Sequence, residues 1–163
     1  MSVEFQVDTR ELDRLARRLS ALSQIDQQDV LEGIGALVES QTKDRIRNEK
    51  TAPDGTPWEP WKDWYASTRH GGQSLLVGEG DRDDSAHLDS SIQYIVEGDE
   101  VSVGSNLPYA AMHQFGGTTS PKSWMPNKEI PARPYLGLST DDRDGLADVM
   151  EGFLQDQLEE LVR

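Results

Sequence analysis

The sequence predicts an α+β domain in which N-terminal helices and a long C-terminal helix pack on a small, mainly antiparallel sheet. Apolar residues recur at helical spacing near both ends of the chain, and they alternate with polar residues on either side of a tight turn at residues 91–104. A length of 163 residues suits one domain with a real core, because two halves would each bury too little surface. We therefore treat residues 1–163 as a single domain.

The N-terminal third is expected to hold a short strand and two helices. Residues 3–7 alternate apolar and polar side chains, as a half-buried strand does. Residues 12–22 carry a stripe of leucines, and a second stripe, beginning after Asp26, runs from Val30 to Ile46. Glycine inside a helix costs about 1 kcal/mol relative to alanine. Gly33 and Gly35 therefore either permit the close approach of another element or stand there by chance.

Residues 48–68 are rich in proline and tryptophan. Residues 53–57 (PDGTP) have the composition of a turn. The aromatic residues that follow are spaced so that they would share one side of a short helical turn: Trp58, Trp61, Trp64 and Tyr65. Such rings could stack nucleic-acid bases, but only Lys62 and Arg69 lie nearby. A hydrophobic cluster over the helices, or contact with a neighbouring subunit, is the better interpretation.

The hairpin at residues 91–104 is the clearest local prediction. Two alternating segments flank a two-residue Gly98-Asp99 loop, which sets Glu97 opposite Glu100. One or two helical turns are expected from Pro108 onward, ended by the Gly-Gly pair at 116–117.

The last third is expected to form a loop, an extended segment and a helix. Residues 117–129 form a polar loop, and we expect this loop and the one at about 71–88 to be mobile and to order against partners. Pro131 and Pro134 favour an extended segment from Ile130 to Leu136, at a sheet edge or on a return path. Arg133 between them is a candidate for a salt bridge to an acidic neighbour, inside the chain or across subunits. A final helix is expected from Ser139 or Thr140.

Negative charge is concentrated in two parts of the chain. The formal net charge is −14, with eight acidic residues against one basic residue in residues 79–100, and eight against two in residues 141–163. Duplex DNA binders cluster Lys and Arg, and this chain has no such cluster. The acidity fits a conduit for DNA, a protein unrelated to DNA, or a need for solubility alone. The candidates for carboxylates facing such a conduit are Glu79, Asp81, Asp83, Asp84 and Asp89.

No motif indicates catalysis, a cofactor or a metal, so we predict a protein that is not an enzyme. The chain has no cysteine, which excludes disulfides and Cys-based zinc sites. The acidic run at 81–84 lacks the rest of a calcium-binding loop. No known motif places a nucleophile next to His113, so we expect this histidine to hold its turn in place by hydrogen bonds. No apolar run approaches the roughly 20 residues of a membrane span, and the N-terminus lacks a signal-peptide pattern.

Several short motifs occur along this chain in the order in which one protein family carries them. They are Gly104-Ser105, Tyr109-Ala110, residues 113–117 (HQFGG) and residues 131–137 (PARPYLG), preceded by residues 44–47 (DRIR) and 53–58 (PDGTPW). The arrangement resembles the phage virion morphogenesis family, the tail completion proteins of Mu-like and related tailed phages. The resemblance implies a virion protein, made in the host cytoplasm, that forms a ring at the head end of the tail. A hexamer is expected, with the tail tube or terminator and the neck or connector proteins as partners and DNA passing through unbound.

On that interpretation, one set of residues is the candidate for subunit or partner contacts: Trp58, Trp61, Tyr109, His113, Gln114, Phe115, Trp124, Arg133 and Tyr135. Two other functions compete. An acidic inhibitor that mimics DNA is compatible with the charge, but does not require the weakly basic segment 101–140 or the tryptophans. A hydrolase using a carboxylate and a histidine would need a nucleophile or ligand motif that the sequence lacks.

Overall fold

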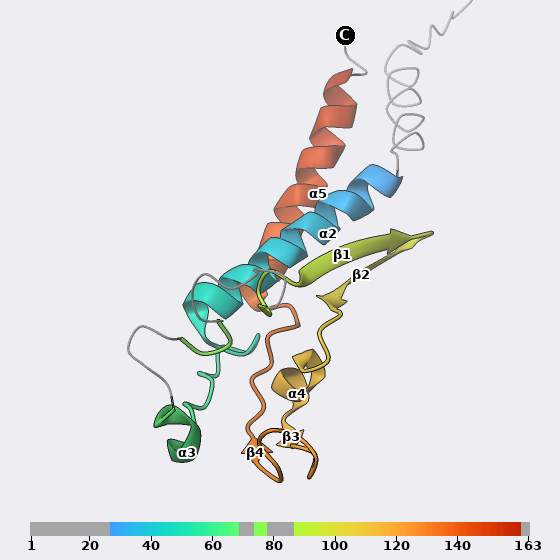
Figure 1. The fold of residues 1–163 in the computed structure, drawn as a ribbon. Helices are drawn as coiled ribbons and strands as arrows, with labels where there is room; N and C mark the ends of the chain where they lie inside the picture. Colours follow the sequence, from blue (N-terminus) through green and yellow to red (C-terminus); the bar gives the residue numbers. More distant parts are fainter. Residues whose placement is uncertain (1–26, 69–73, 78–86, 161–163) are drawn as a thin grey trace, which may run out of the picture.

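The computed structural model describes residues 27–68, 74–77 and 87–160 (Figure 1). The strand expected at residues 3–7, the helix expected at 12–22 and most of the loop expected at about 71–88 lie outside the described residues. The described part combines helices with two short antiparallel ribbons, which confirms the predicted α+β class.

Helix α2, Gln27–Asp44, is the element on which the hairpin and the C-terminal helix pack. It confirms the helix expected after Asp26, and it widens at its end into a π-helical turn, η1, Arg45–Glu49. The turn buries Arg45 and Ile46 completely. It ends at Lys50, whose φ of 58° is left-handed and whose backbone N–H donates to the Arg45 carbonyl at 3.0 Å.

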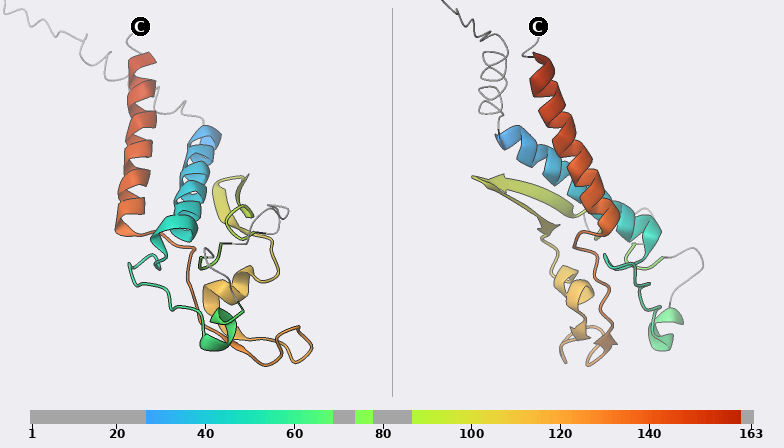
Figure 2. Two further views of the ribbon diagram at one scale, coloured as in Figure 1. Left: turned by 60° about the vertical axis from the view of Figure 1, so that its left-hand side comes forward. Right: turned by 180° about the vertical axis from the view of Figure 1, so that it is seen from behind.

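The long C-terminal helix α5, Thr140–Glu160, lies along one side of α2 (Figure 2). The two run antiparallel, because Gly145 faces Leu37 and Gln41 while Phe153 faces Gly33. The start of α5 is capped reciprocally. The Asp142 N–H donates to the Ser139 hydroxyl at 3.0 Å, and the Ser139 N–H donates to the Asp142 carboxylate at 2.8 Å.

The predicted hairpin lies on another side of α2. Strands β1, Ile92–Glu97, and β2, Glu100–Ser105, pair in the expected register, with Glu97 opposite Glu100. The glycines of α2 permit both helix and hairpin to approach: a methyl group on Gly33 would lie 2.8 Å from the Phe153 ring, and one on Gly35 would lie 2.4 Å from the Tyr94 ring. Close approach, not chance, explains these two glycines.

The other end of the molecule consists of short elements and extended chain (Figure 1). Helix α3, Asp63–Ala66, and helix α4, Ala110–Phe115, lie there, together with β3, Gly117–Thr118, which pairs with β4, Glu129–Ile130. This second ribbon is separate from the hairpin, so the predicted sheet is divided in two. Of the segment expected to be extended, Ile130 pairs in β4, and the residues after it are not part of a strand.

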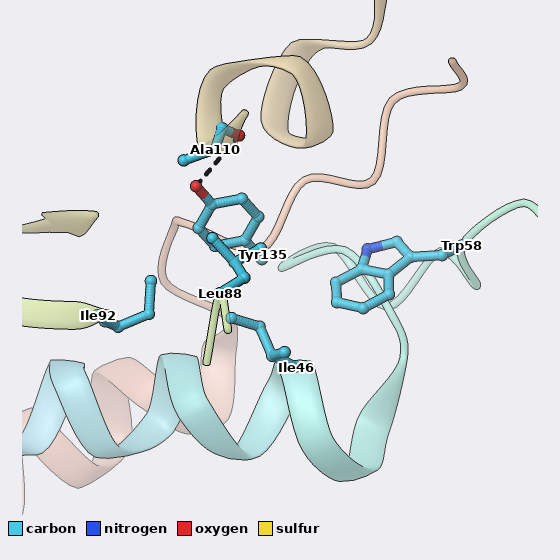
Figure 3. Close-up of a cluster of buried hydrophobic side chains, with 6 residues drawn as sticks. All are labelled: Ile46, Trp58, Leu88, Ile92, Ala110 and Tyr135. Carbon is cyan, nitrogen blue, oxygen red and sulfur yellow. Dashed lines mark hydrogen bonds between the residues drawn. The ribbon is translucent and has the colours of Figure 1, made fainter. Parts of the chain in front are cut away.

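A small hydrophobic core joins the two ends (Figure 3). Its six members come from different parts of the chain: Ile46, Trp58, Leu88, Ile92, Ala110 and Tyr135. The Tyr135 hydroxyl donates to the Ala110 carbonyl at 3.2 Å, which satisfies its polar group inside the core. Loops thus supply as much of this core as helices and strands do.

Candidate functional site

An aromatic cleft of about 380 Å³ opens at the end of the molecule that carries α3 and α4. Helix α3 and the residues before it form one wall, and α4 with the segment 124–133 forms the other. The side chains that shape it are Trp61, Trp64, Tyr109, His113, Trp124 and Arg133. The Lys128 ammonium lies 5.3 Å from the centre of the Trp64 ring, so a cation–π contact links the two walls.

Arg133 holds the walls together from within the protein. Only 4% of it is exposed, and its guanidinium donates to the backbone carbonyls of Glu59 and Pro60 at 2.9 and 3.0 Å. Its backbone N–H donates to the His113 carbonyl at 2.7 Å. The expected salt bridge to a carboxylate is replaced by hydrogen bonds to the chain that leads into α3. Arg133 is therefore a brace of the cleft and not an exposed contact residue.

His113 lies in the wall of the cleft and is neutral at physiological pH. Burial of the ring, and to a smaller extent the nearby Arg133 charge, together lower its pKa from 6.5 to about 4. Its Nδ1 atom is buried without a hydrogen-bond partner among the described residues. The main-chain carbonyl of His113, rather than its ring, pins the turn to Arg133.

Gln114 acts as a clamp on the segment that follows Arg133. Its side-chain oxygen accepts from the Tyr135 and Leu136 N–H groups at 2.9 and 3.0 Å, and its amide nitrogen donates to the Leu136 carbonyl at 3.2 Å. These bonds replace the strand pairing that the segment lacks. Tyr135 is 1% exposed, so Gln114 and Tyr135 serve the interior of the subunit.

Trp58 is also part of the interior. It is 6% exposed, and its indole N–H donates to the Pro134 carbonyl at 2.9 Å. The expected helical turn of aromatic residues is limited to Trp64 and Tyr65, because α3 begins at Asp63. Of the four aromatic residues, Trp61, Trp64 and Tyr65 line the cleft and Trp58 does not.

Three of the candidate contact residues do face solvent. Phe115 is 78% exposed, Trp124 is 82% exposed and Tyr109 is 39% exposed. Phe115 follows His113 by two positions in α4, which turns it about 200° around the helix, away from the cleft. The molecule therefore presents two separate apolar features, the cleft with Trp124 at its edge and the Phe115 ring behind it.

The loop that carries Trp124 is fixed at its base by hydrogen bonds of its own. The Thr119 N–H donates to the Lys128 carbonyl at 2.9 Å, and the Lys128 N–H donates to the Thr119 hydroxyl at 2.8 Å. The Ser123 hydroxyl donates to the Met125 carbonyl at 2.8 Å. A defined base thus presents the exposed tryptophan, even without a partner.

Asp89 is not placed as a conduit-facing carboxylate. It is 7% exposed, and Arg47 donates to it at 2.7 Å, so its charge is neutralised inside the subunit. The other four acidic candidates, Glu79, Asp81, Asp83 and Asp84, lie outside the described residues. Within the described ranges, no group of three or more His, Asp or Glu side chains could hold a metal ion, and no helix is long and apolar enough to cross a membrane.

A buried ion pair between Arg45 and Asp142 was not predicted from the sequence. Arg45 is 1% exposed and donates to the Asp142 carboxylate and to the carbonyls of Tyr135 and Gly137 at 3.1 and 2.9 Å. The spacing of Ser139 and Asp142 is the pattern of a reciprocal helix cap, which could have indicated the role of Asp142. Nothing in the sequence pairs Asp142 with a residue 97 positions away.

Three known proteins are similar to this chain. A putative capsid assembly protein G of Escherichia phage Mu is 31% identical over 124 residues, covering 74% of this chain and 72% of that protein. Two Mu-like prophage FluMu G proteins of Haemophilus influenzae also match. Protein 2 is 41% identical over 49% of this chain and 53% of its own length, and protein 1 is 26% identical over 100% and 99%. No solved structure matches the chain.

These similarities define the class first: a small α+β protein of phage structure or assembly. The chain belongs to the phage virion morphogenesis family, whose sequence model matches residues 7–155. The match spans the helices, the hairpin and the aromatic cleft, so the described structure lies almost wholly within the family region.

Proposed function

We propose that this protein completes the phage tail at its head-proximal end and takes part in joining tail to head. It would act as a ring of identical subunits, expected to be six, around the DNA channel. Membership of the phage virion morphogenesis family supports a role in phage assembly. The phage Mu relative is named as a putative capsid assembly protein, which agrees with a place near the head.

The observation that carries the proposal is the pair of exposed aromatic features at the cleft end. Phe115 and Trp124 are 78% and 82% exposed. Aromatic residues are enriched in protein interfaces, where they contribute much of the binding energy. The hydrogen bonds of Arg133, Gln114 and Thr119 fix the segments that carry Phe115 and Trp124. Little conformational entropy is therefore lost when a partner covers these two side chains.

Two different apolar features on one subunit suit a closed ring. A contact in which one surface meets a different surface of the next copy is head-to-tail, and such contacts make rings when the rotation closes. The Phe115 ring on one side of α4 and the cleft on the other are two such surfaces. The ring proposal therefore requires that Phe115 and the cleft both lie in interfaces.

The acidic segment 79–84 is proposed to face the channel. Four carboxylates there, with Arg82 as the one basic residue, would repel the DNA backbone and keep passing DNA from sticking. Asp89 is left out of this role because it is buried and paired with Arg47. Replacing Glu79, Asp81, Asp83 and Asp84 with serine should leave the fold intact and slow DNA ejection. Unchanged ejection and infectivity would contradict the channel role.

The first test measures the mass of the purified protein by light scattering over a concentration series, alone and with isolated phage tails. Assembly into a ring, in solution or on the tails, is expected. Phe115→Ser and Trp124→Ser should abolish it while the circular dichroism spectrum stays that of the wild type. Ile95→Ser is the matched control, because Ile95 is also 59% exposed but lies on the hairpin.

Two outcomes would overturn the proposal. Wild-type binding to tails by both serine variants would show that the exposed aromatics are not contact residues. A monomer that ignores tails but inhibits a nuclease or polymerase would favour the acidic DNA mimic instead.

A further inference from the structure

Helix α5 has an apolar strip beside the face that it packs against α2. Val149 and Phe153 face α2 at Gly33. Met150 and Leu154 lie on the adjacent side of the helix, one turn apart, and are 49% and 40% exposed. We call these two residues the Met150/Leu154 strip. Leu158 continues the same four-residue spacing in the sequence. Two large apolar side chains in one line on a helix indicate a surface that another element covers.

The charge around the strip restricts what can cover it. Helix α5 contains eight acidic residues and one arginine. An apolar partner that also carried negative charge would be repelled, whereas a basic amphipathic helix would be attracted along its length.

One segment of this chain has both properties. Residues 12–22 place Leu12, Leu15, Leu19 and Leu22 in one helical stripe, and residues 9–22 contain four arginines against two acidic residues. We propose that residues 12–22 form a helix that packs its leucine stripe on the Met150/Leu154 strip of the same chain. The result is a three-helix bundle with α2 and α5, and it stands whether or not the proposed ring forms.

Chain connectivity favours the same chain as the source. Four residues, 23–26, separate Leu22 from Gln27, the first residue of α2. Connections this short join antiparallel neighbours in helix bundles. Because α5 is also antiparallel to α2 and its later turns lie beside the start of α2 at Gly33, the returning helix would run parallel to α5. Parallel helices with residues four apart in each would pair Leu15 with Met150 and Leu19 with Leu154.

A cysteine cross-link tests this packing directly, because the chain has no cysteine of its own. Leu15→Cys combined with Met150→Cys should oxidise to a bridge within one chain, seen as a faster-migrating monomer that reverts with reductant. The bridge requires Cα atoms roughly 4.4–6.8 Å apart, so it reports close packing. Leu15→Cys with Ile95→Cys is the control and should not bridge within the chain, because Ile95 is on the hairpin at another side of α2. Covalent dimers of the first variant, or no bridge at all, would overturn the proposal.

Hydrogen exchange provides a second test that uses a single substitution. Met150→Lys places a positive charge beneath the arginine-rich segment and removes an apolar contact. Amide exchange in residues 12–22 should become about tenfold faster, as expected when a packed helix loses its support. Gln155→Lys adds the same charge at an exposed position of α5 and should change it little. Unaltered exchange of β1 and β2 shows that the fold is intact; equal exchange of residues 12–22 in both variants and the wild type would contradict the proposal.

Discussion

Arg45 is the residue on which the junction between the two ends of the molecule depends. It emerges from the π-helical turn, lies 1% exposed, and its guanidinium bonds the Asp142 carboxylate and two carbonyls of the chain leading into α5. Burial would raise the pKa of Asp142, but hydrogen bonds from Ser139 and Arg45 and the Arg45 charge outweigh it, so the pKa lies below the usual value of an aspartate. A charge so enclosed is stable only while all its partners are present.

Arg45→Ala should therefore destabilise the protein by about 3–5 kcal/mol, because it leaves a buried carboxylate unpaired. Chemical unfolding followed by circular dichroism measures this. Lys62→Ala removes an exposed ion pair with Glu59 and should change stability by less than about 1 kcal/mol. Similar losses in the two variants would show that the Arg45 pair contributes no more than a surface pair.

His113 should make stability depend on pH below neutrality. In the folded protein its pKa is lowered from 6.5 to about 4, so the unfolded chain takes up the proton first. Its contribution is fully present above about pH 6.5 and is lost as pH falls towards 4, by roughly 1 kcal/mol for each pH unit.

The measurement is the free energy of unfolding at pH 7.5, 6.5, 5.5 and 4.5 for the wild type and for His113→Gln, which cannot titrate. The difference between the two proteins should shift in favour of the variant as pH falls. A constant difference across the series would mean that the ring is not buried as the structure shows.

At the scale of elements, the sequence of α2 allows neighbouring elements to pack closely on it, at some cost in helix propensity. Its two interior glycines face different neighbours, Phe153 of α5 and Tyr94 of β1. Each weakens the helix locally, and each allows a partner to pack closer than a side chain would permit. The cleft end is stabilised differently: single side chains such as Gln114 and Arg133 form hydrogen bonds with backbone segments that are not paired in strands.

Gly35→Ala should destabilise the protein by about 1–3 kcal/mol, since the new methyl group would lie 2.4 Å from the Tyr94 ring and the overlap exceeds the gain in helix propensity. Gly152→Ala in α5 is the control. Nothing lies within 4 Å of its added methyl group, so it should stabilise by about 0.5–1 kcal/mol. Thermal unfolding of both variants checks the opposite signs. Stabilisation by both would show that the hairpin does not pack closely on α2.

At the scale of the whole molecule, the long helices and the short elements lie at different ends (Figure 1). Helices α2 and α5 with the hairpin form one end, and the cleft, α4 and the Trp124 loop form the other. The core of Ile46, Trp58, Leu88, Ile92, Ala110 and Tyr135 connects them (Figure 3). Substitutions at Phe115 and Trp124 can therefore change contacts with partners without removing the support of the fold.

The net charge of −14 leads to a prediction for the molecule as a whole. The isolated protein should not bind duplex DNA measurably at about 0.15 M salt, since binding requires several phosphates to be neutralised by clustered basic residues. Fluorescence anisotropy with a labelled duplex measures this over a salt series. Tight binding that weakens steeply with salt would contradict a channel from which DNA is repelled.

Much of the local structure could be predicted from the sequence. The hairpin register, the helix after Asp26, the helix before Gly116 and the start of α5 follow from periodicity, turn residues and caps, which act over a few positions. The family resemblance rests on short motifs in the same way, and the family match confirms it. It was harder to predict which of the nine candidate contact residues are exposed, because the residue type alone does not show whether an aromatic side chain is buried.

By itself, the sequence determined the α+β class, the hairpin and the helices that flank it, the family and the acidic charge, since all of these are encoded in neighbouring residues. It did not predict the β3–β4 ribbon, which lies where a polar loop was expected. Only the tertiary structure decided that Trp58, Gln114, Arg133 and Tyr135 brace the interior while Phe115 and Trp124 face solvent, and that Asp89 and Asp142 are paired with arginines. The physical reason is distance along the chain. Burial and ion pairing at these positions depend on partners tens of residues away, and no local pattern records where those partners lie.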